Sequence, residues 1–246
     1  MTDSSLTPLR GRRVIVSGGT TGIGRAIAVM LAAEGARVFI GGTDPQHLAD
    51  ALADIRKAGE GDGITLDLAE ADNVGRFVDA GIAALGGVDV AVVNAAVAAE
   101  GLHEMDEPAL RHAIGLNFTA YLLTAHAAER AMEEGDIVLI GSMSAHVLGP
   151  GSTVYAGIKA GIAGFAEALR RELGPRGIRV ALVEPGKTGS DMQKPDVPDH
   201  KQRQMIAAET MLAAGDIAAG VRFLLTQPRR SVVQQLTISP RAQEAE

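Results

Sequence analysis

Two side chains with acid–base chemistry, Tyr155 and Lys159, stand four residues apart in the stretch Tyr-Ala-Gly-Ile-Lys. On a helix this spacing places both on one face, about one turn from each other. A free tyrosine has a pKa near ~10, but an adjacent ammonium group stabilises the phenolate and lowers that pKa. The pair therefore predicts a proton-transfer site, although two solvated residues on a helix surface would show the same spacing.

A glycine-rich turn near the N-terminus predicts a phosphate-binding site. Gly18, Gly22 and Gly24 stand between the β-branched run Arg13–Ser17 and an alanine-rich segment over 25–34. In a strand–turn–helix unit the first glycine permits the tight turn and the second lets backbone approach a pyrophosphate, while the third lets the helix pack closely on the strand. We expect a dinucleotide to bind the whole turn, which comprises Gly18, Thr20, Thr21, Gly22, Ile23 and Gly24; a plain flexible turn is the alternative.

The end of the second predicted strand, over 37–40, bears on the choice of coenzyme. It continues as Gly41-Gly42-Thr43-Asp44. In dinucleotide folds a carboxylate at this place binds the 2′-hydroxyl of NAD, whereas a cation or small polar group tolerates the 2′-phosphate of NADP. Because Gly42 stands where the acid is expected, Gly42 and Thr43 favour NADP(H), with NAD(H) as the alternative. Asp44 precedes a proline and is interpreted as a helix N-cap.

Three more polar residues need a reason for their places. Asn94 follows the apolar strand predicted over 88–93, where its amide can tie adjacent strands together; a turn asparagine is the alternative. Asn117 falls inside a long helix predicted over 108–132, and an asparagine amide there competes for backbone partners. Ser142 follows the strand predicted over 136–140. We therefore expect all three near the site.

The elements that position these residues alternate along the chain. Strands are predicted over 13–17, 37–40, 63–66, 88–93, 136–140, 178–183 and 232–238, and helices over 25–34, 45–58, 71–85, 108–132, 152–173 and 216–226. This alternation without a linker or internal repeat predicts one α/β domain over 11–240, between a flexible N-terminus (1–10) and a C-terminal tail (241–246). The polar segment over 187–204 is predicted to be irregular, within a lid at about 187–212.

Composition excludes several functions. The chain of 246 residues carries a net charge of −7, which argues against nucleic acid or an anionic membrane surface as partner. It has no cysteine, which excludes disulfides, thiol catalysis and zinc–thiolate sites, and we expect no metal site. Residues 1–10 lack the apolar core of a signal peptide, and no apolar run reaches the ~18 residues of a membrane span. The expected compartment is the cytoplasm.

Taken together, the motifs over residues 11–240 resemble those of the short-chain dehydrogenase/reductase family, in its short "classical" type. They follow in that family's order: Gly18, Gly22, Gly24, Asn94, Asn117, Ser142, Tyr155, Lys159 and Pro185-Gly186. Ser142 also stands thirteen residues before Tyr155, as the family pattern asks. The resemblance implies a Rossmann fold, a doubly wound seven-stranded parallel sheet with helices on both faces, and hydride transfer between a nicotinamide and a carbonyl or alcohol carbon. One departure is Asn94-Ala95-Ala96, where the family usually has Asn-Ala-Gly.

By the same resemblance, Tyr155 exchanges the proton and Ser142 orients the substrate oxygen. Lys159 lowers the pKa of Tyr155 and holds the nicotinamide ribose, and Asn117 anchors a water that relays protons to solvent. The remaining coenzyme contacts implied by the resemblance are Asp67, Leu68, Asn94, Ala95, Ala96, Pro185, Gly186, Thr188 and Ser190.

The substrate is a small carbonyl or alcohol compound whose identity the sequence leaves open. Candidate residues around it are Met143, Ser144, His146, Leu148, Lys187 and Met192. His146 is equally well interpreted as a surface residue, and Lys187 as a solvated loop lysine or a partner for an acidic substrate. The leading hypothesis is an NADPH-dependent ketone or keto-acid reductase. The alternatives are an NAD-dependent secondary-alcohol dehydrogenase and a non-catalytic dinucleotide sensor. The resemblance also suggests a homotetramer built on the helices over 108–132 and 152–174.

Overall fold

A single parallel sheet forms the centre of the molecule. The computed structural model describes residues 6–70, 72–194 and 196–242. In this part of the chain seven strands pair in the order β3-β2-β1-β4-β5-β6-β7, all parallel. They are β1 (Arg13–Ser17), β2 (Arg37–Gly42), β3 (Glu60–Thr65), β4 (Val90–Val93), β5 (Gly135–Ile140), β6 (Ile178–Pro185) and β7 (Gln235–Ile238). The order reverses between β1 and β4, and at such a switch point a doubly wound sheet leaves a crevice beside the strand ends.

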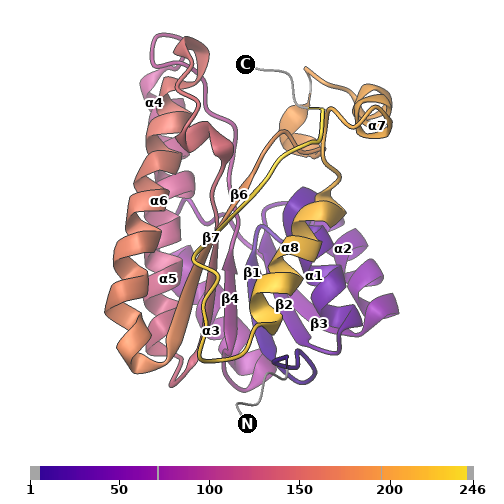
Figure 1. Cartoon of the computed structure of the whole chain (residues 1–246), viewed down its shortest axis with the longest axis vertical. Helices are drawn as coiled ribbons and strands as arrows, with labels where there is room; N and C mark the ends of the chain where they lie inside the picture. The colour runs from indigo at the N-terminus through magenta and orange to yellow at the C-terminus, as the bar shows by residue number, and fades with distance from the viewer. Residues whose placement is uncertain (1–5, 71, 195, 243–246) are drawn as a thin grey trace.

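Helices cover both faces of the sheet, as predicted (Figure 1). One buried cluster joins the sheet to α1 (Gly22–Ala33), α2 (Pro45–Ala58) and α8 (Ala214–Thr226). The other joins it to α3 (Asn73–Leu85), α5 (Ala120–Arg130) and α6 (Thr153–Leu173). The central strands are buried along their whole length and consist of Val, Ile, Leu and Ala, as expected for a sheet covered on both sides. The predicted single-domain Rossmann fold is confirmed.

The long helix predicted over 108–132 is interrupted. Its first part is α4 (Glu107–Ile114), and a π-helical turn, η1 (Gly115–Thr119), leads from it into α5. A π turn inserts one extra residue and is often found at functional sites.

The segment predicted to be irregular over 187–204 contains helical structure. A short turn, η5 (Asp191–Gln193), precedes the helix α7 (Asp199–Ala207). The helix was missed because its sequence is polar and lacks an apolar stripe; its buried residue is Gln202. The Gln202 side chain donates hydrogen bonds to the carbonyls of Ser190 and Val197, which ties α7 to the segment before it. Tertiary hydrogen bonds therefore take the place of the usual hydrophobic anchor.

The described ends of the chain are held by the domain. Thr7 donates from its backbone N–H to the Thr226 carbonyl, and Leu9 is buried. Thr7 and Leu9, within the segment predicted to be flexible, therefore contact the domain, while residues 1–5 lie outside the described residues. Of the predicted tail, Ala242 donates to the Glu209 carbonyl, and 243–246 are likewise outside. Among the described helices, none has the length and apolar character that a membrane crossing requires.

Candidate active site

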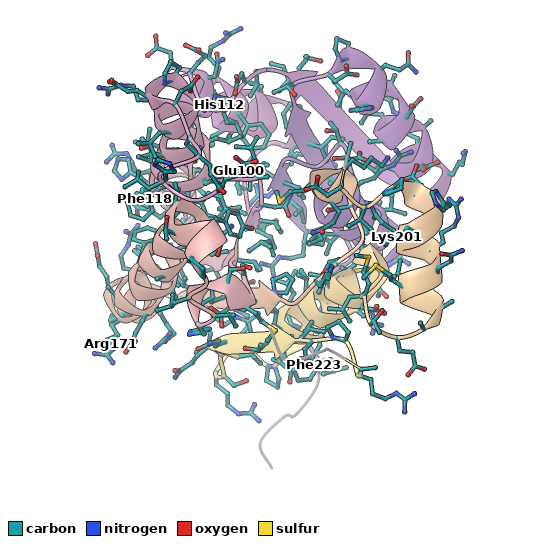
Figure 2. All side chains as sticks on the ribbon, turned by 90° about the horizontal axis from the view of Figure 1, so that it is seen from above. Glu100, His112, Phe118, Arg171, Lys201 and Phe223 are labelled. Carbon is teal, nitrogen blue, oxygen red and sulfur yellow. The ribbon has the colours of Figure 1, made fainter. Side chains whose placement is uncertain are left out.

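A cleft of about 1430 Å³ opens at the carboxyl ends of the strands, where the strand order reverses. Drug-sized pockets are commonly ~300–1,000 Å³, so the cleft has room for a dinucleotide and a small substrate together. Figure 2 looks down on this edge of the molecule, with His112 of α4 on one side and Lys201 of α7 on another. The cleft is lined from the glycine turn after β1, the ends of β2, β4, β5 and β6, and the first part of α6.

Most of the residues predicted from the sequence meet in this cleft. Those that line it are Gly18, Thr20, Thr21, Gly22, Ile23, Gly42, Thr43, Asp67, Leu68, Asn94, Ala95, Ala96, Ser142, Met143, Ser144, Leu148, Tyr155, Lys159, Pro185, Gly186, Lys187, Thr188, Ser190 and Met192. Three predicted residues, Gly24, Asn117 and His146, do not line it, and each has a different structural place.

The glycine turn fits a dinucleotide because it lacks side chains where the backbone must come close. Gly18 has φ of +63°, and a Cβ there would lie 2.7 Å from Ala95 Cα. A Cβ at Gly24 would lie 2.1 Å from the Gly18 carbonyl oxygen, so Gly24 packs behind the turn and not in the cleft. The result is a bare backbone cradle at the N-terminus of α1, where helix N–H groups favour a phosphate.

Asn94 joins the two strands on either side of the switch point. Its Nδ2 donates to the carbonyls of Ser17 and Gly18, at 3.2 and 3.0 Å, and its backbone N–H donates to Ser17 Oγ at 2.9 Å. The amide therefore fixes the floor of the cleft between β1 and β4. This is the tie between strands that the sequence predicted for Asn94.

Ser142 and Tyr155 form the acid–base end of the cleft. Ser142 caps the short turn η2 (Met143–Ala145), accepting from the Ser144 N–H, and its Oγ lies 3.1 Å from Ser144 Oγ. Burial raises the pKa of Tyr155, and a hydrogen bond with the Ser142 side chain partly opposes that increase. Ser142 and Tyr155 both line the cleft, as the family resemblance implied for these two residues.

The ammonium group of Lys159 has two hydrogen-bond partners at the end of β5. Its Nζ donates to the Ile140 carbonyl at 3.0 Å and to Tyr121 Oη at 3.3 Å, and it lies 5.5 Å from the centre of the Tyr155 ring. Burial lowers the pKa of Lys159 to about 7. Burial raises the pKa of Tyr155, and the effect of Lys159 on that pKa stays a prediction.

Asn117 lies behind the cleft and supports its wall. It is fully buried in η1, where Oδ1 accepts from the Val97 N–H and Nδ2 donates to the Val97 carbonyl, both at 2.8 Å. Val97 itself lines the cleft. The side chain therefore holds the segment after β4 directly, and the expected role of Asn117 in anchoring a water stays a prediction.

The end of β2 is neutral where it enters the cleft. Gly42 and Thr43 line it together with Thr20 and Thr21, whereas Asp44 caps α2 by accepting from the His47 N–H at 2.8 Å. The N-cap interpretation of Asp44 is confirmed. Neither an acid nor a cation among the described residues lines the cleft beside Thr43 on this strand end.

His146 turns away from the cleft toward the sheet. Its Nε2 lies 2.9 and 3.0 Å from the two carboxylate oxygens of Glu184, which is fully buried and also accepts from Gln235. The sequence did not identify Glu184 as a site residue because it lies inside an apolar strand. Its position directly before Pro185-Gly186 was the one feature that could have indicated a functional role. The cleft is lined instead by the exposed apolar side chains of Leu148 and Met192 and by Lys187.

No set of three or more acidic or histidine side chains in the described residues is arranged to bind a metal ion. The hydroxyl groups of Ser142 and Tyr155 and the ammonium group of Lys159 line the cleft together with the glycine turn.

Comparisons with known proteins agree with this geometry. A family model described as short chain dehydrogenase matches residues 12–201. L-rhamnose 1-dehydrogenase (NAD(P)(+)) of Azotobacter vinelandii is 34% identical over 235 residues, which cover 90% of this chain and 92% of that protein. The 3-oxoacyl-acyl-carrier-protein reductase FabG of Escherichia coli is 33% identical over 220 residues, covering 87% and 89%.

Solved structures show the same architecture. A short chain dehydrogenase from Burkholderia cenocepacia J2315 in complex with NADP superposes with a TM-score of 0.85 at 34% identity, covering 95% of this chain and 98% of that one. The family match, the sheet order and the cleft agree: the chain belongs to the short-chain dehydrogenase/reductase family and is an NAD(P)-dependent oxidoreductase acting on CH–OH or carbonyl groups.

Proposed function

We propose that the protein is an NADPH-dependent reductase of ketones or keto acids. The observation that carries this proposal is the place of Ser142 and Tyr155, which line the same cleft as the glycine cradle. When bound, the coenzyme supplies the hydride. The chain supplies the proton and holds the reacting oxygen.

The proton balance favours reduction. As hydride reaches a carbonyl carbon, negative charge grows on the oxygen, and two preplaced hydroxyl groups stabilise that charge more than they stabilise the ground state. Because burial raises the pKa of Tyr155, the phenol remains protonated at neutral pH and can donate to the new alkoxide. Ser142 then orients the same oxygen by a hydrogen bond.

The coenzyme preference is proposed from the end of β2. The neutral Gly42 and Thr43 offer no carboxylate to repel a 2′-phosphate, which supports NADP(H). The similar Burkholderia protein is in complex with NADP, and the Azotobacter relative is named for both coenzymes. We place Thr188, Ser190 and the Pro185–Gly186 turn beside the nicotinamide, and Asp67 and Leu68 beside the adenine, since all of them line the cleft.

The test follows NADPH and NADH oxidation with a panel of ketones, keto acids and sugars, comparing the wild-type protein with Tyr155→Phe. We expect turnover with NADPH, and a loss of ~10²- to 10⁴-fold in kcat for Tyr155→Phe with the coenzyme Kd unchanged. An active Tyr155→Phe enzyme would contradict the assigned proton donor.

The same experiment separates the alternatives. Tighter binding of NADH than NADPH, with turnover of secondary alcohols by NAD, would favour a dehydrogenase. Coenzyme binding without turnover on any substrate of the panel would favour a dinucleotide sensor.

A further inference from the structure

Tyr121 is a buried tyrosine to which the mechanism above assigns no role. The chain contains two tyrosines, Tyr155 in the cleft and Tyr121 in the first turn of α5. The side chain of Tyr121 is only 1% exposed and does not line the cleft. A hydroxyl buried so deeply needs hydrogen-bond partners, and those partners identify what it does.

The partners of Tyr121 connect it to Lys159. Tyr121 Oη donates to the Ile140 carbonyl at 3.0 Å, and Lys159 Nζ donates to the same carbonyl at 3.0 Å. Lys159 Nζ also lies 3.3 Å from Tyr121 Oη and 4.9 Å from the centre of the Tyr121 ring. The three groups form a closed triangle at the end of β5, directly before Gly141 and Ser142.

Counting donors shows the consequence for Lys159. A lysine ammonium has three N–H donors. Two of them are used by the Ile140 carbonyl and by the hydroxyl of Tyr121, which does not line the cleft, and one remains for the cleft that Lys159 lines. The geometry points to Tyr121 as a positioning residue: its hydroxyl and ring hold the Lys159 ammonium against the Ile140 carbonyl and direct the remaining N–H into the cleft.

The hydrogen bond from Lys159 to Tyr121 is important because of the charges around Lys159. Within the described ranges no carboxylate forms an ion pair with Lys159, and the titratable groups that contact it are Tyr121 and Tyr155. Burial alone disfavours the ammonium and lowers the Lys159 pKa to about 7. Neutral acceptors that hydrogen-bond the charged form oppose this effect, and a ring face does so by a cation–π contact. Without the Tyr121 hydroxyl, the Lys159 pKa should fall further.

The chain offers a matched control one turn along the same helix. Thr124 is also buried, at 1% exposure, and its Oγ1 has no hydrogen-bond partner. Thr124→Val removes a buried hydroxyl from α5 as Tyr121→Phe does, without touching Lys159. The comparison therefore separates an effect on Lys159 from a general effect of altering α5.

The first measurement titrates Lys159 directly, by NMR of protein labelled with ¹³C at lysine Cε. The chain has five lysines, and the Lys159→Met variant identifies the buried one. We expect the Lys159 pKa to be lower by about half to one unit in Tyr121→Phe and unchanged in Thr124→Val. An unchanged Lys159 pKa in a folded Tyr121→Phe protein would overturn the proposal.

A second measurement keeps the Tyr121 hydroxyl in place. In Tyr155→Phe the only remaining tyrosine is Tyr121, so incorporation of 3-fluorotyrosine gives a single ¹⁹F signal. This signal should titrate with the Lys159 pKa, and the titration should vanish in the double variant with Lys159→Met. A ¹⁹F signal that is insensitive to Lys159 would contradict the anchor even if Tyr121→Phe failed to fold.

The effect of Tyr121→Phe on turnover rests on the proposed function and is measured separately, from the pH profile of kcat/KM. If turnover needs protonated Lys159, activity is lost as pH rises through the Lys159 pKa. The upper limb of the pH profile of kcat/KM for NADPH should then move to lower pH in Tyr121→Phe by the shift seen in the NMR titration. A shift of the Lys159 pKa in Tyr121→Phe, with no turnover by the wild-type protein, would contradict the proposed reductase activity. It would still support Tyr121 as the residue that positions Lys159. If the pH profile of kcat/KM changes equally in Tyr121→Phe and Thr124→Val, Tyr121 acts only through packing and the proposal is wrong.

Discussion

Lys187 lies exposed on the rim of the cleft, directly after the Pro185–Gly186 turn. Its neighbour Lys194 pairs with Asp191 and Asp199, at 2.9 and 2.8 Å, whereas Lys187 forms no ion pair within the described residues. An unpaired cation beside the substrate end of the cleft suits a carboxylate on the substrate. We therefore propose Lys187 as the residue that distinguishes keto acids from neutral ketones.

Lys187→Ala should raise KM for carboxylated substrates by about threefold to fivefold and leave kcat and neutral ketones unchanged. The effect is modest because an exposed ion pair is weakened by solvent and salt. Steady-state kinetics on a matched keto acid and its methyl ketone measure it, with Lys201→Ala on α7 as the control. An equal change in KM for both substrates would contradict this role of Lys187.

At the level of elements, the π turn η1 connects α4 to α5 and carries Asn117 toward Val97. The two hydrogen bonds to Val97 satisfy both polar groups of that backbone unit. Because Val97 lines the cleft, these hydrogen bonds connect the wall of the cleft to the turn between α4 and α5.

Asn117→Ala would leave the Val97 N–H and carbonyl without their partner. An unsatisfied group out of reach of water costs ~1–3 kcal/mol; because Val97 is half-buried and lines the cleft, we expect the free energy of unfolding to fall by ~1–3 kcal/mol in total. We also expect weaker coenzyme binding, since the cleft wall is no longer held. Urea unfolding and coenzyme titration measure the two effects, and unchanged stability would show that Asn117 does not support the wall.

At the level of the whole molecule, α6 presents small side chains on its outer surface. Exposed Gly157, Ala160, Gly164 and Ala168 follow one another at helical spacing, and nothing lies within 4 Å of a Cβ placed on either glycine. Figure 2 shows Phe118 and Arg171 on this flank, away from Lys201 of α7. Such a surface permits another helix to approach closely, which supports the proposal of a homotetramer built on α4, α5 and α6.

Sedimentation equilibrium should therefore give the mass of a tetramer, and Ala160→Arg should shift it to a smaller species while α6 itself stays folded. The arginine adds bulk and charge at the contact, and it is a good helix former. Circular dichroism checks the fold of the variant. A wild-type monomer at working concentration would refute the tetramer.

The sequence by itself determined what is local along the chain. Strand and helix periodicity, the glycine turn after β1, the cap at Asp44 and the four-residue spacing of Tyr155 and Lys159 depend on short-range geometry, which the residue order contains. Parallel strands bring their carboxyl ends to one edge, so the alternation also placed Asn94 and Ser142 in the same cleft.

Only the tertiary structure decided which side chains become partners across long separations and which are buried. Lys159 is held by Tyr121, His146 by Glu184 and Val97 by Asn117. Tyr121 and Lys159 come from different helices, and their meeting depends on how α5 and α6 pack against the end of β5. Desolvation also arises only from packing, and it raises the pKa of Tyr155.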